Sequence, residues 1–540
     1  MMKVSIGTPL DDSFQPKFYH TRKMPYKRVG EAIGEEFNDW VPWVPVLINA
    51  PTGLGKTTFV NDALIKKAIS CNRNVLILNN RVGLTLQQKH KIIKILGRTD
   101  DKEYTPEGLR KKEDFGQIRI MTYHRLLSFL SDDSNTEWCD NLMYVVMDEA
   151  HFFVADSLFN EKCDSFQSLI ARKFRNAIRV YLTATPYDSL YSLASIEESN
   201  YNRFVDFFSN PLYKYERERY MIHYKFERDY SNYNLNFFTQ LEELIPKIED
   251  TSTGKWIIFI DNKLRAEEFI NMLSVPSVYL DATRKNSNVW VNLIANERFD
   301  TKVLVSTSVL DCGVNINDRQ LKNIAIITDS RTSMMQMVGR KRLEEGEKVE
   351  VWIGDLSTES IYRRLQRYDG YLDLRAELYK CTQIKSYYSF GTKLWESEDA
   401  VVRKLFSSPS PRIYENKNAF VYIQRQAEFL NRILSGESNF RYEVEEWFQK
   451  EHPPLINRLD EFYSIHRDKV LAEREQNVLR EIILQLCREQ GLTEAQLKRA
   501  STLQYNALNN RLRDIEMPYS IVNLSDSGWQ LKYLSEGKEE

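Results

Sequence analysis

The stretch A-P-T-G-L-G-K-T-T, residues 50–58, decides the fold. Gly53 and Gly55 allow successive backbone N–H groups to turn inward around the β- and γ-phosphates of a nucleotide, at the start of a helix. Lys56 neutralises phosphate charge, and Thr57 is a ligand for a metal ion. We therefore predict that ATP is held by Ala50, Pro51, Thr52, Gly53, Leu54, Gly55, Lys56, Thr57 and Thr58.

The apolar run V-P-V-L-I-N-A, residues 44–50, leads directly into this loop. A short continuous apolar run is typical of a strand that is buried on both faces of a parallel sheet. A strand, a glycine-rich loop and a helix, in this order, form the context in which such a loop binds phosphates. The local sequence therefore predicts an α/β fold built around a nucleotide.

A second motif, D-E-A-H at residues 148–151, follows another apolar run, N-L-M-Y-V-V-M at residues 141–147. Because ligands bind at the carboxyl ends of parallel strands, we expect Asp148 to lie beside the phosphate loop. Mg²⁺ takes few carboxylates and keeps several waters, so we assign Thr57 and Asp148 to the metal. Glu149 then orients and deprotonates the attacking water.

The composition is that of a globular protein with several domains. The chain has 540 residues, of which 42% are hydrophobic and 28% charged, and this length suggests about three or four domains. No apolar run approaches the roughly 20 residues needed to cross a bilayer. The N-terminal sequence does not have the pattern of a secretory signal. We expect a cytoplasmic protein that has no membrane segment.

The net charge and the cysteines narrow the possible ligands. The formal net charge is −2, so any nucleic-acid binding requires a local basic groove. The six cysteines are scattered and form no CxxC pair, which argues against a zinc knuckle, an iron–sulfur cluster or a disulfide framework. They are Cys71, Cys139, Cys163, Cys312, Cys381 and Cys487.

A second series of strands and helices follows the first. The strand pattern R-V-Y-L-T-A-T-P, residues 179–186, completes one nucleotide-binding core, and the composition changes near Tyr215. G-K-W-I-I-F-I-D at residues 254–261 then opens a new alternation, which includes K-V-L-V-S-T at residues 302–307 and I-A-I-I-T-D at residues 324–329. This alternation predicts a second parallel α/β domain.

The remaining sequence, from about Ser357, has mainly helical patterns. Its last part, from Leu492, predicts two helices and a hairpin, which could be a winged helix-turn-helix reader of duplex DNA or a packing module. We predict four domains, with bounds at 1–214, 215–356, 357–468 and 469–540.

Seven sequence blocks occur in the order found in superfamily 2 helicases of the DEAD/DEAH-box type, which the chain resembles over residues 30–345. The resemblance implies an α/β fold class with two tandem RecA-like parallel-sheet domains and a mainly helical C-terminal region. It also implies an ATP hydrolase that uses Mg²⁺. The blocks are A-P-T-G-L-G-K-T, N-N-R-V-G-L-T-L-Q, M-T-Y-H-R-L-L, D-E-A-H, L-T-A-T-P, S-T-S-V-L-D-C-G-V-N-I and Q-M-V-G-R-K-R.

The last block, Q-M-V-G-R-K-R, implies a charged finger that neutralises the leaving phosphate. Such a finger is worth on the order of 10³-fold or more in rate. The usual family spacing is Q-x-x-G-R-x-x-R, but here Leu343 holds the last position and Arg342 comes one residue early. The resemblance therefore assigns catalysis to Gln336, Arg340 and Arg342, with Arg340 as the expected finger.

Other residues receive roles by the same resemblance. His151, Thr183 and Thr185 would couple the nucleotide site to movement of the two domains. Gly313 and Asn315 fall where the family approaches the nucleotide.

Three more positions match residues that hold the backbone of a single strand. They are Arg81 and Thr122 in the first domain and Thr307 in the second. Such contacts position a strand without reading its sequence.

The function that this resemblance implies is ATP-driven translocation along nucleic acid, with a single strand in the groove between the domains. We favour DNA, because the adenine-reading block of many RNA-remodelling members is absent and the blocks look most like those of herpesvirus-type origin-binding helicases and their phage and mobile-element relatives. A duplex could bind at the C-terminal region, and a protein partner in a replication, mobile-element or defence complex is possible.

Three alternatives stay open from the sequence. They are an RNA helicase or remodeller of the same fold, a translocase subunit of a restriction or antiphage complex that does not unwind DNA, and a catalytically silent scaffold. The scaffold predicts the loss of Lys56, Asp148, Glu149 or Arg340, and all four are present.

Overall fold

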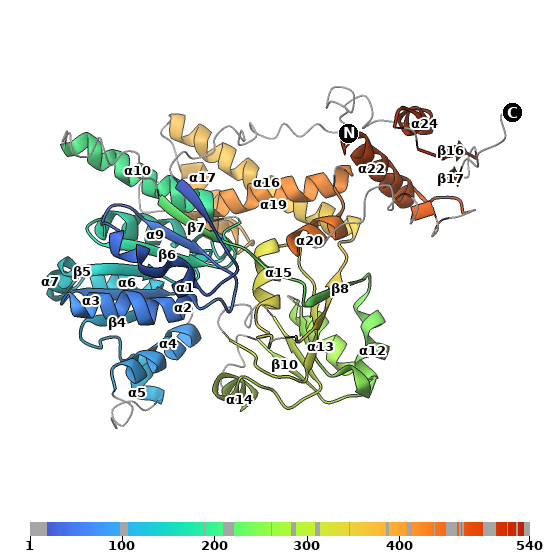
Figure 1. The fold of residues 1–540 in the computed structure, drawn as a ribbon. Coiled ribbons are helices and arrows are strands. Elements are labelled where there is room, and N and C mark those ends of the chain that lie inside the picture. The colour runs from blue at the N-terminus through green and yellow to red at the C-terminus, as the bar shows by residue number, and fades with distance from the viewer. Residues whose placement is uncertain are drawn as a thin grey trace. The chain divides into compact units, whose positions relative to one another are not determined.

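The computed structural model describes residues 19–533 apart from 81, 98–105, 188, 209–220, 261, 282–287, 308–313, 345, 385–387, 408–412, 437, 450–458, 460–461, 464–465, 467–468, 490–503, 516 and 525–527. The chain divides into two compact units. The first unit is Met1–Gly354 with Gln366–Ala427, and the second is Asp355–Leu365 with Glu428–Glu540. Figure 1 shows the elements of both.

The first sheet has seven strands, all parallel, in the order β1-β7-β2-β6-β5-β3-β4. The strand before the phosphate loop, β2, lies inside the sheet, and the strand before D-E-A-H, β5, lies two places away. The bounds are β1 Tyr19–Met24, β2 Val46–Asn49, β3 Asn74–Asn79, β4 Ile118–Thr122, β5 Leu142–Met147, β6 Ile178–Thr183 and β7 Met221–Phe226.

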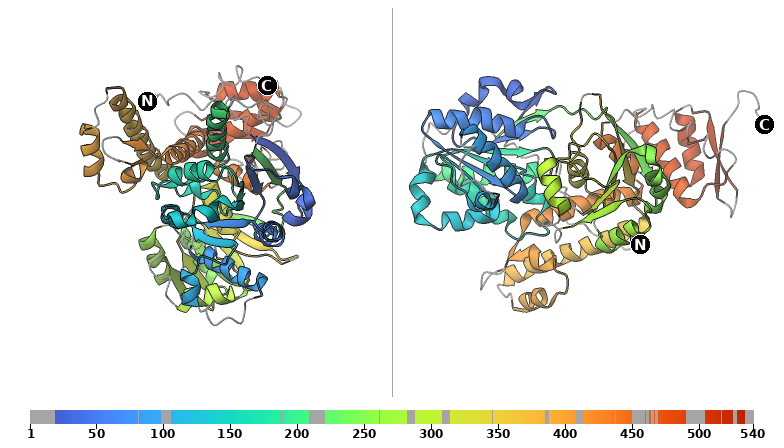
Figure 2. Two further views of the ribbon diagram at one scale, coloured as in Figure 1. Left: turned by 90° about the vertical axis from the view of Figure 1, so that its left-hand side faces the viewer. Right: turned by 90° about the horizontal axis from the view of Figure 1, so that it is seen from below.

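Both faces of this sheet are covered by helices, which explains its continuous apolar strands. Because side chains alternate along a strand, Val46 and Ile48 join one buried cluster while Leu47 joins the other. Figure 2 shows helices on both sides of the sheet, blue on one and teal on the other. These helices are α1 Val29–Ile33, η1 Gly34–Asp39, α2 Lys56–Phe59, η2 Val60–Ile65, α3 Lys66–Ser70, α4 Val82–Ile95, α5 Pro106–Lys111, α6 Tyr123–Leu130, η3 Asp133–Asn135, α7 Thr136–Asp140, α8 Phe152–Ala155, α9 Cys163–Lys173 and α10 Leu190–Phe208.

The second sheet has six parallel strands in the order β10-β11-β9-β12-β13-β8. Its strands are β8 Tyr233–Phe238, β9 Lys255–Phe259, β10 Ser277–Leu280, β11 Val303–Ser306, β12 Leu321–Ile326 and β13 Val349–Gly354. Its helices are η4 Leu241–Leu244, α12 Ile245–Glu249, η5 Thr251–Thr253, α13 Lys263–Asn271, α14 Asn288–Asn296 and α15 Arg331–Val338. The prediction of two tandem parallel-sheet domains is confirmed.

The chain after the second sheet is mainly helical, as predicted. Its elements are α16 Thr358–Ile384, α17 Tyr388–Glu396, α18 Val402–Leu405, β14 Phe406–Ser407, β15 Tyr414–Glu415, α19 Lys417–Ser435, α20 Phe440–Trp447, α22 Glu473–Glu489, α24 Tyr505–Asp514, β16 Tyr519–Asn523 and β17 Trp529–Tyr533. The described helices include none that is long and apolar enough to cross a membrane.

Helix α19 is fastened to the first domain by a buried polar network. The Asp164 carboxylate accepts hydrogen bonds from the backbone N–H groups of Lys417 and Asn418 at the start of the helix. The Asn418 side chain also donates to Gln167 Oε1 at 2.9 Å and accepts from Ser192. Because buried polar groups are costly when unpaired, this network fixes the helix in one position on the first domain.

The second unit has its own apolar core. It contains Leu479 and Ile483 of α22, Leu508 of α24 and Leu531 of the hairpin. Strands β16 and β17 pair antiparallel, so the predicted hairpin is confirmed. The helix predicted from Leu492 lies outside the described residues.

Two predicted domain boundaries are wrong. The first domain does not end at residue 214, because β7 pairs with β1 and β2 of the first sheet. The boundary at 468/469 is also too late, since Leu459 and Phe462 pack in the same core as Leu479. Both errors come from short segments whose partners are far away in the sequence.

His223 makes the stability of the first sheet dependent on pH. It is buried on β7, with its ring nitrogens near Thr21 Oγ1 at 3.0 Å and Asn49 Nδ2 at 3.5 Å. Burial, together with the Lys225 cation, lowers the pKa of His223 to about 4.

In the unfolded chain, His223 therefore binds a proton below its ordinary pKa of 6.5. In the folded chain, the His223 side chain stays neutral until the pH falls to about 4. We expect the free energy of unfolding to fall by about 2 kcal/mol between pH 7 and pH 5 through this residue. In urea denaturation, the free energy of unfolding of His223→Gln should differ less between pH 7 and pH 5 than that of the unaltered protein. An equal difference in both proteins would contradict the prediction.

Candidate active site

A cavity of about 320 Å³ lies between the loops of the two sheet domains, within the first unit. The phosphate loop, the D-E-A-H motif and the Q-M-V-G-R-K-R block all reach it. Its lining is Thr52, Gly53, Gly55, Lys56, Thr57, Thr58, Gln88, Lys91, Asp148, Glu149, Asn315, Arg340 and Arg342. The sequence-predicted parts of the nucleotide site therefore meet in one place.

The phosphate loop has the conformation that its glycines allow. Gly53 and Gly55 have φ angles of 92° and 82°, in the left-handed region that other residues rarely adopt. Gly55 is the N-cap of α2, so the free N–H groups of the first helical turn face the cavity end of the loop. This geometry suits an anion, as the motif predicts.

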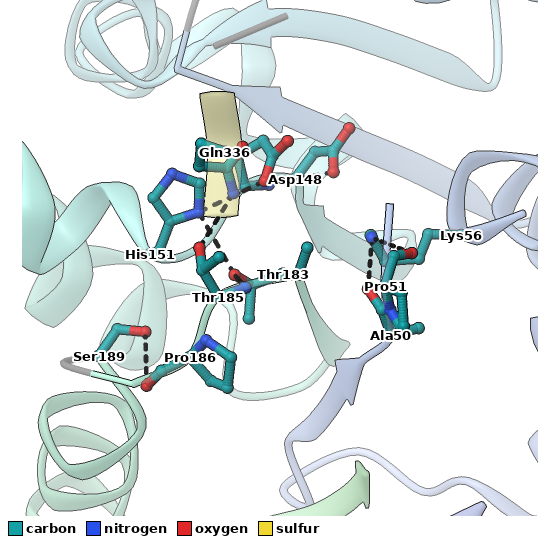
Figure 3. Close-up of polar contacts among 12 residues, drawn as sticks. Ala50, Pro51, Lys56, Asp148, His151, Thr183, Thr185, Pro186, Ser189 and Gln336 are labelled. Carbon is teal, nitrogen blue, oxygen red and sulfur yellow. Dashed lines mark hydrogen bonds and ion pairs between the residues drawn. The ribbon is translucent and has the colours of Figure 1, made fainter. Parts of the chain in front are cut away.

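Lys56 turns back onto its own loop, as Figure 3 shows. Its Nζ donates to the carbonyl oxygens of Ala50 at 2.7 Å and Pro51 at 3.2 Å. Burial lowers its pKa to about 8, against the opposing effect of the Glu149 and Asp148 charges. The ammonium is thus held in the cavity by neutral carbonyl groups, which a phosphate could replace.

The D-E-A-H motif begins where β5 leaves the sheet. The Asp148 N–H still bonds to Leu78 O of β3 at 2.9 Å, and the Ala150 N–H bonds to Leu182 O of β6 at 2.8 Å. Between them Glu149 has a φ angle of 52°. A left-handed conformation is unfavourable for glutamate and persists where the surroundings impose it, which is common at functional sites.

The two carboxyl groups have opposite pKa shifts. Burial and the neighbouring Glu149 charge raise the pKa of Asp148, against the Lys56 cation. Burial also raises the pKa of Glu149, but the hydrogen bond and charge of His151, with the cations of Lys56 and Arg340, outweigh it and lower that pKa. Glu149 is therefore kept as a carboxylate, the form that accepts a proton or orients a water.

A series of polar contacts runs from this carboxylate across to the second domain. Figure 3 shows its part from His151 through the two threonines to Gln336. Nδ1 of His151 lies 3.3 Å from Glu149 Oε2 and 3.3 Å from Thr183 Oγ1. Thr183 Oγ1 accepts from the Thr185 N–H at 3.0 Å. Thr185 Oγ1 in turn accepts from Gln336 Nε2 at 3.0 Å. The residues predicted to couple the site to domain movement are therefore in contact.

Arg340 ends this series. Its guanidinium donates to the Gln336 side-chain oxygen and to the Gln336 carbonyl, each at 2.9 Å. The side chain is buried at the cavity, which fixes its direction. Arg340 is thus placed as a rigid cation opposite the phosphate loop.

Arg342 reaches the cavity as well, despite its shifted spacing. Its guanidinium donates twice to Asn315 Oδ1, at 3.0 Å and 2.6 Å. A Cβ on Gly53 would lie only 3.5 Å from its Nη1. Burial and the Arg340 charge lower the pKa of Arg342 to about 10, so it remains a cation at neutral pH. Asn315 serves here as the acceptor that orients it.

The predicted nucleic-acid residues lie outside the cavity lining. Thr122 is the N-cap residue of α6 at the end of β4, and Thr307 follows β11 with its N–H bonded to Leu280 O at 3.3 Å. Both stand at carboxyl ends of strands. Arg81 and Gly313 lie outside the described residues, so their roles stay predictions.

Sequence reasoning missed several residues at the site. Gln88 and Lys91 of α4 line the cavity, and both lie just beyond the N-N-R-V-G-L-T-L-Q block. Arg228, in the segment between the sheets, donates to Asn49 Oδ1 at 2.8 Å and to the Ala184 carbonyl. No motif marks Arg228, because its partners are a strand end and a backbone carbonyl.

Tyr187, just after L-T-A-T-P, was missed too. The Arg331 guanidinium from the second domain lies 3.8 Å from the centre of its ring, and that of Arg228 lies 5.5 Å away. Such cation–π contacts add to the attraction between the domains. The contact could not be read from the sequence, since the two partners are far apart in the chain.

The charges of the cavity suit an anionic ligand. Lys56, Lys91, Arg340 and Arg342 face only two carboxylates, those of Asp148 and Glu149. A polyphosphate with its metal ion would balance this excess of cations.

Two family models match the chain. The model described as "Type III restriction enzyme, res subunit" matches residues 28–188, and the "Helicase conserved C-terminal domain" matches residues 237–342. The two matches cover the two sheet domains in turn. No curated protein matches the chain in sequence.

The comparison with solved structures gives matches of low identity and low TM-score. The S. cerevisiae Dbp5 bound to RNA and ADP BeF3 has a TM-score of 0.42 and 13% identity, over 59% of this chain and 81% of that one. The DUF1998 helicase MrfA bound to DNA has a TM-score of 0.42 and 17% identity, over 59% of this chain and 45% of that one. Mss116p bound to ssRNA and AMP-PNP has a TM-score of 0.42 and 14% identity, over 85% of this chain and 88% of that one.

The site and the two family models define the class of protein. The chain carries the two core domains of an ATP-dependent nucleic-acid helicase. The domains are those of helicase superfamily 2, as the order of the sequence blocks indicates.

The contact between Thr185 and Gln336 should matter for turnover. Thr185→Val keeps the shape of the side chain and leaves Gln336 Nε2 without its acceptor. We expect kcat of ATP hydrolysis to fall roughly fivefold to tenfold, since a lost hydrogen bond is worth about 1 kcal/mol. KM for ATP should change less than kcat. Ser189→Ala, which removes a nearby 3.4 Å bond to Pro186 O, is the matched control and should leave kcat unchanged.

Gly339 allows the second domain to approach the phosphate loop. A Cβ on Gly339 would lie 2.8 Å from Thr52 Oγ1 and 3.2 Å from Met335 O. We expect Gly339→Ala to oppose closure of the cleft and to raise KM for ATP. Residues in contact have interaction energies of roughly 0.5–3 kcal/mol in a double-mutant cycle, and we expect a value in this range for Gly339 and Thr52. In the background of Thr52→Ala, the same change should have a smaller effect. Equal effects in both backgrounds would contradict the steric explanation.

Proposed function

We propose that the protein is a DNA helicase or translocase that hydrolyses ATP between its two sheet domains. The observation that carries the proposal is the series of contacts from Glu149 through His151, Thr183, Thr185 and Gln336 to Arg340. It links the expected base of hydrolysis to the expected finger in the other domain. A change at the phosphates can therefore alter the relative position of the domains.

The residues present fit a magnesium ion. Thr57 and Asp148 line the same cavity, and the Asp148 residue is only 8% exposed. A buried carboxylate is costly unless a cation compensates its charge, and Mg²⁺ prefers oxygen ligands. Thr57 and Asp148 would hold the ion, which when bound would neutralise part of the charge of the phosphates.

The protein groups divide the work of hydrolysis. Lys56 and the N–H groups of the phosphate loop hold the phosphates in place. Glu149 orients the attacking water and accepts its proton. Arg340 and Arg342 stabilise the charge that develops on the leaving phosphate. Because the arginines come from the second domain, hydrolysis requires a closed cleft.

The preference for DNA rests on the sequence blocks. The adenine-reading block of RNA-remodelling relatives is absent, and G-R-K-R with N-R-V-x-L-T resembles DNA-acting members. Thr122 and Thr307 stand at strand ends of the two domains, where a single strand would run. The solved neighbours include proteins bound to RNA and to DNA, so the nucleic acid is a subject for direct measurement.

A second candidate is a DNA translocase subunit that moves along duplex DNA without separating it. The match of residues 28–188 to the model "Type III restriction enzyme, res subunit" favours it. In that case a partner protein would supply any cleavage of DNA.

The first test is the steady-state ATPase of the full chain, alone and with single-stranded DNA, duplex DNA or single-stranded RNA. We expect single-stranded DNA to stimulate hydrolysis most. Glu149→Gln should lower the stimulated kcat by on the order of 10²-fold or more, as expected for loss of a general base, while nucleotide binding persists.

The other outcomes are equally informative. Stimulation by RNA alone would overturn the assignment to DNA. Stimulation only by duplex DNA, without displacement of a labelled strand, would favour the translocase subunit. Hydrolysis that survives in Glu149→Gln would contradict the role of that residue.

A further inference from the structure

A second cavity, of about 370 Å³, lies on the first domain apart from the nucleotide site. It is formed by the end of β3, the start of α6 and the loop after α8, with Lys404 from α18. This volume is within the range of sites for small aromatic ligands. None of its residues has a role in ATP hydrolysis.

Phe159 lines this cavity and is 74% exposed, the largest exposed fraction among the large apolar side chains described. Its loop is nevertheless fixed. The Asn416 side chain donates to Ser157 O at 2.9 Å, and Leu158 packs in the core of the helical segment. The aromatic ring is therefore presented to solvent by a rigid backbone rather than by a loose loop.

A buried amide also lines the cavity. Asn80 is only 6% exposed, and both its side-chain oxygen and its side-chain nitrogen are buried without a hydrogen-bond partner among the described residues. Leaving such groups unsatisfied costs stability. A ligand that offers both a donor and an acceptor would remove that cost.

Polar side chains complete the wall. Nε2 of His124 lies 3.2 Å from Asn160 Nδ2, and the His124 ring packs edge-on to Phe166, so its position is set. Lys162 and Lys404 line the cavity and have no ion pair among the described residues. Asp156 and Glu161 line it too, so the whole cavity has no net charge. The absence of net charge suits a neutral aromatic ring, and the two lysines are placed to bind a phosphate attached to that ring.

The place of the cavity agrees with the proposed path of a single strand. Asn80 directly precedes Arg81, and His124 stands two residues after Thr122. Strands β3 and β4 are neighbours and parallel, so their ends lie side by side. Two predicted backbone contacts therefore flank the cavity in sequence.

We propose that this cavity receives one unstacked base of the bound single strand, which stacks on Phe159 while Lys162 or Lys404 holds its phosphate. The inference rests on the proposed function and adds a base-binding subsite to it. Stacking on an aromatic side chain does not depend on the nucleotide sequence, since every base has a π-face. Through this subsite the protein would bind a base of the strand, in addition to the sugar-phosphate backbone.

The test compares two single-stranded DNA probes of equal length, one with bases and one with abasic residues throughout, by fluorescence anisotropy. Removal of one stacking partner weakens binding roughly tenfold. We therefore expect Phe159→Ala to raise Kd for the base-bearing probe by about tenfold and to leave Kd for the abasic probe unchanged. Phe159→Tyr should bind like the unaltered protein.

Two controls make the result specific. Leu264→Ala removes another exposed side chain, 70% exposed, on the second domain, and should change neither Kd. The double variant Lys162→Ala, Lys404→Ala should weaken binding of both probes and should lower the slope of log K against log salt by about one phosphate contact. The ATPase without nucleic acid should be the same in every variant.

The outcomes separate this inference from the proposed function. If the unaltered protein binds no nucleic acid, the proposed function fails. If it binds DNA and Phe159→Ala binds both probes equally well, the base subsite is overturned while the function stands. Loss of a protein partner from Phe159→Ala, with unchanged DNA binding, would likewise overturn the base subsite and assign Phe159 to that partner.

Discussion

The structure depends on one constraint, which is that the carboxylate of Glu149 must be charged while it is buried. Among the described residues, no ammonium group bonds directly to this carboxylate, since Lys56 is turned toward the loop carbonyls. Instead His151 contacts it, and the contacts continue through two threonines and Gln336 to Arg340. The base therefore keeps its charge mainly through His151 and Lys56 of the first domain, and Arg340 of the second domain adds to their effect. The charge of the base is in this way linked to closure of the cleft.

Much of the fold could be predicted because the site itself fixes it. A phosphate loop requires a preceding strand, and D-E-A-H requires another strand of the same sheet before it, so β2 and β5 could be predicted from their apolar runs. Strands β7 and β8 could not be predicted in this way. Residues 221–226 read M-I-H-Y-K-F, with polar side chains whose partners, such as Thr21 and Asn49, are contributed by other strands. Their place in a sheet is decided by tertiary contacts.

The same division applies to the site. Residues in motifs, such as Lys56 and Arg340, could be identified because phosphate chemistry demands their residue types at those spacings. Arg342 shows that a shift of one position in the sequence need not remove a side chain from the cavity, since a long flexible arginine reaches over it. Arg228 and Tyr187 could not be found, because their roles come only from folding, which brings a linker and a turn together.

The docking of α19 on the first domain has a consequence for the mechanics of the cleft. The chain enters the second sheet after β7 and, beyond β13, continues to a helical segment that Asp164 and Gln167 fasten back onto the first domain. The second sheet is thus tethered at both of its chain ends rather than one. A body held by a single linker can tumble freely, whereas a body held at two points turns mainly about the line that joins them. Each cycle of ATP binding and hydrolysis would then repeat the same rotation of the second sheet about that line.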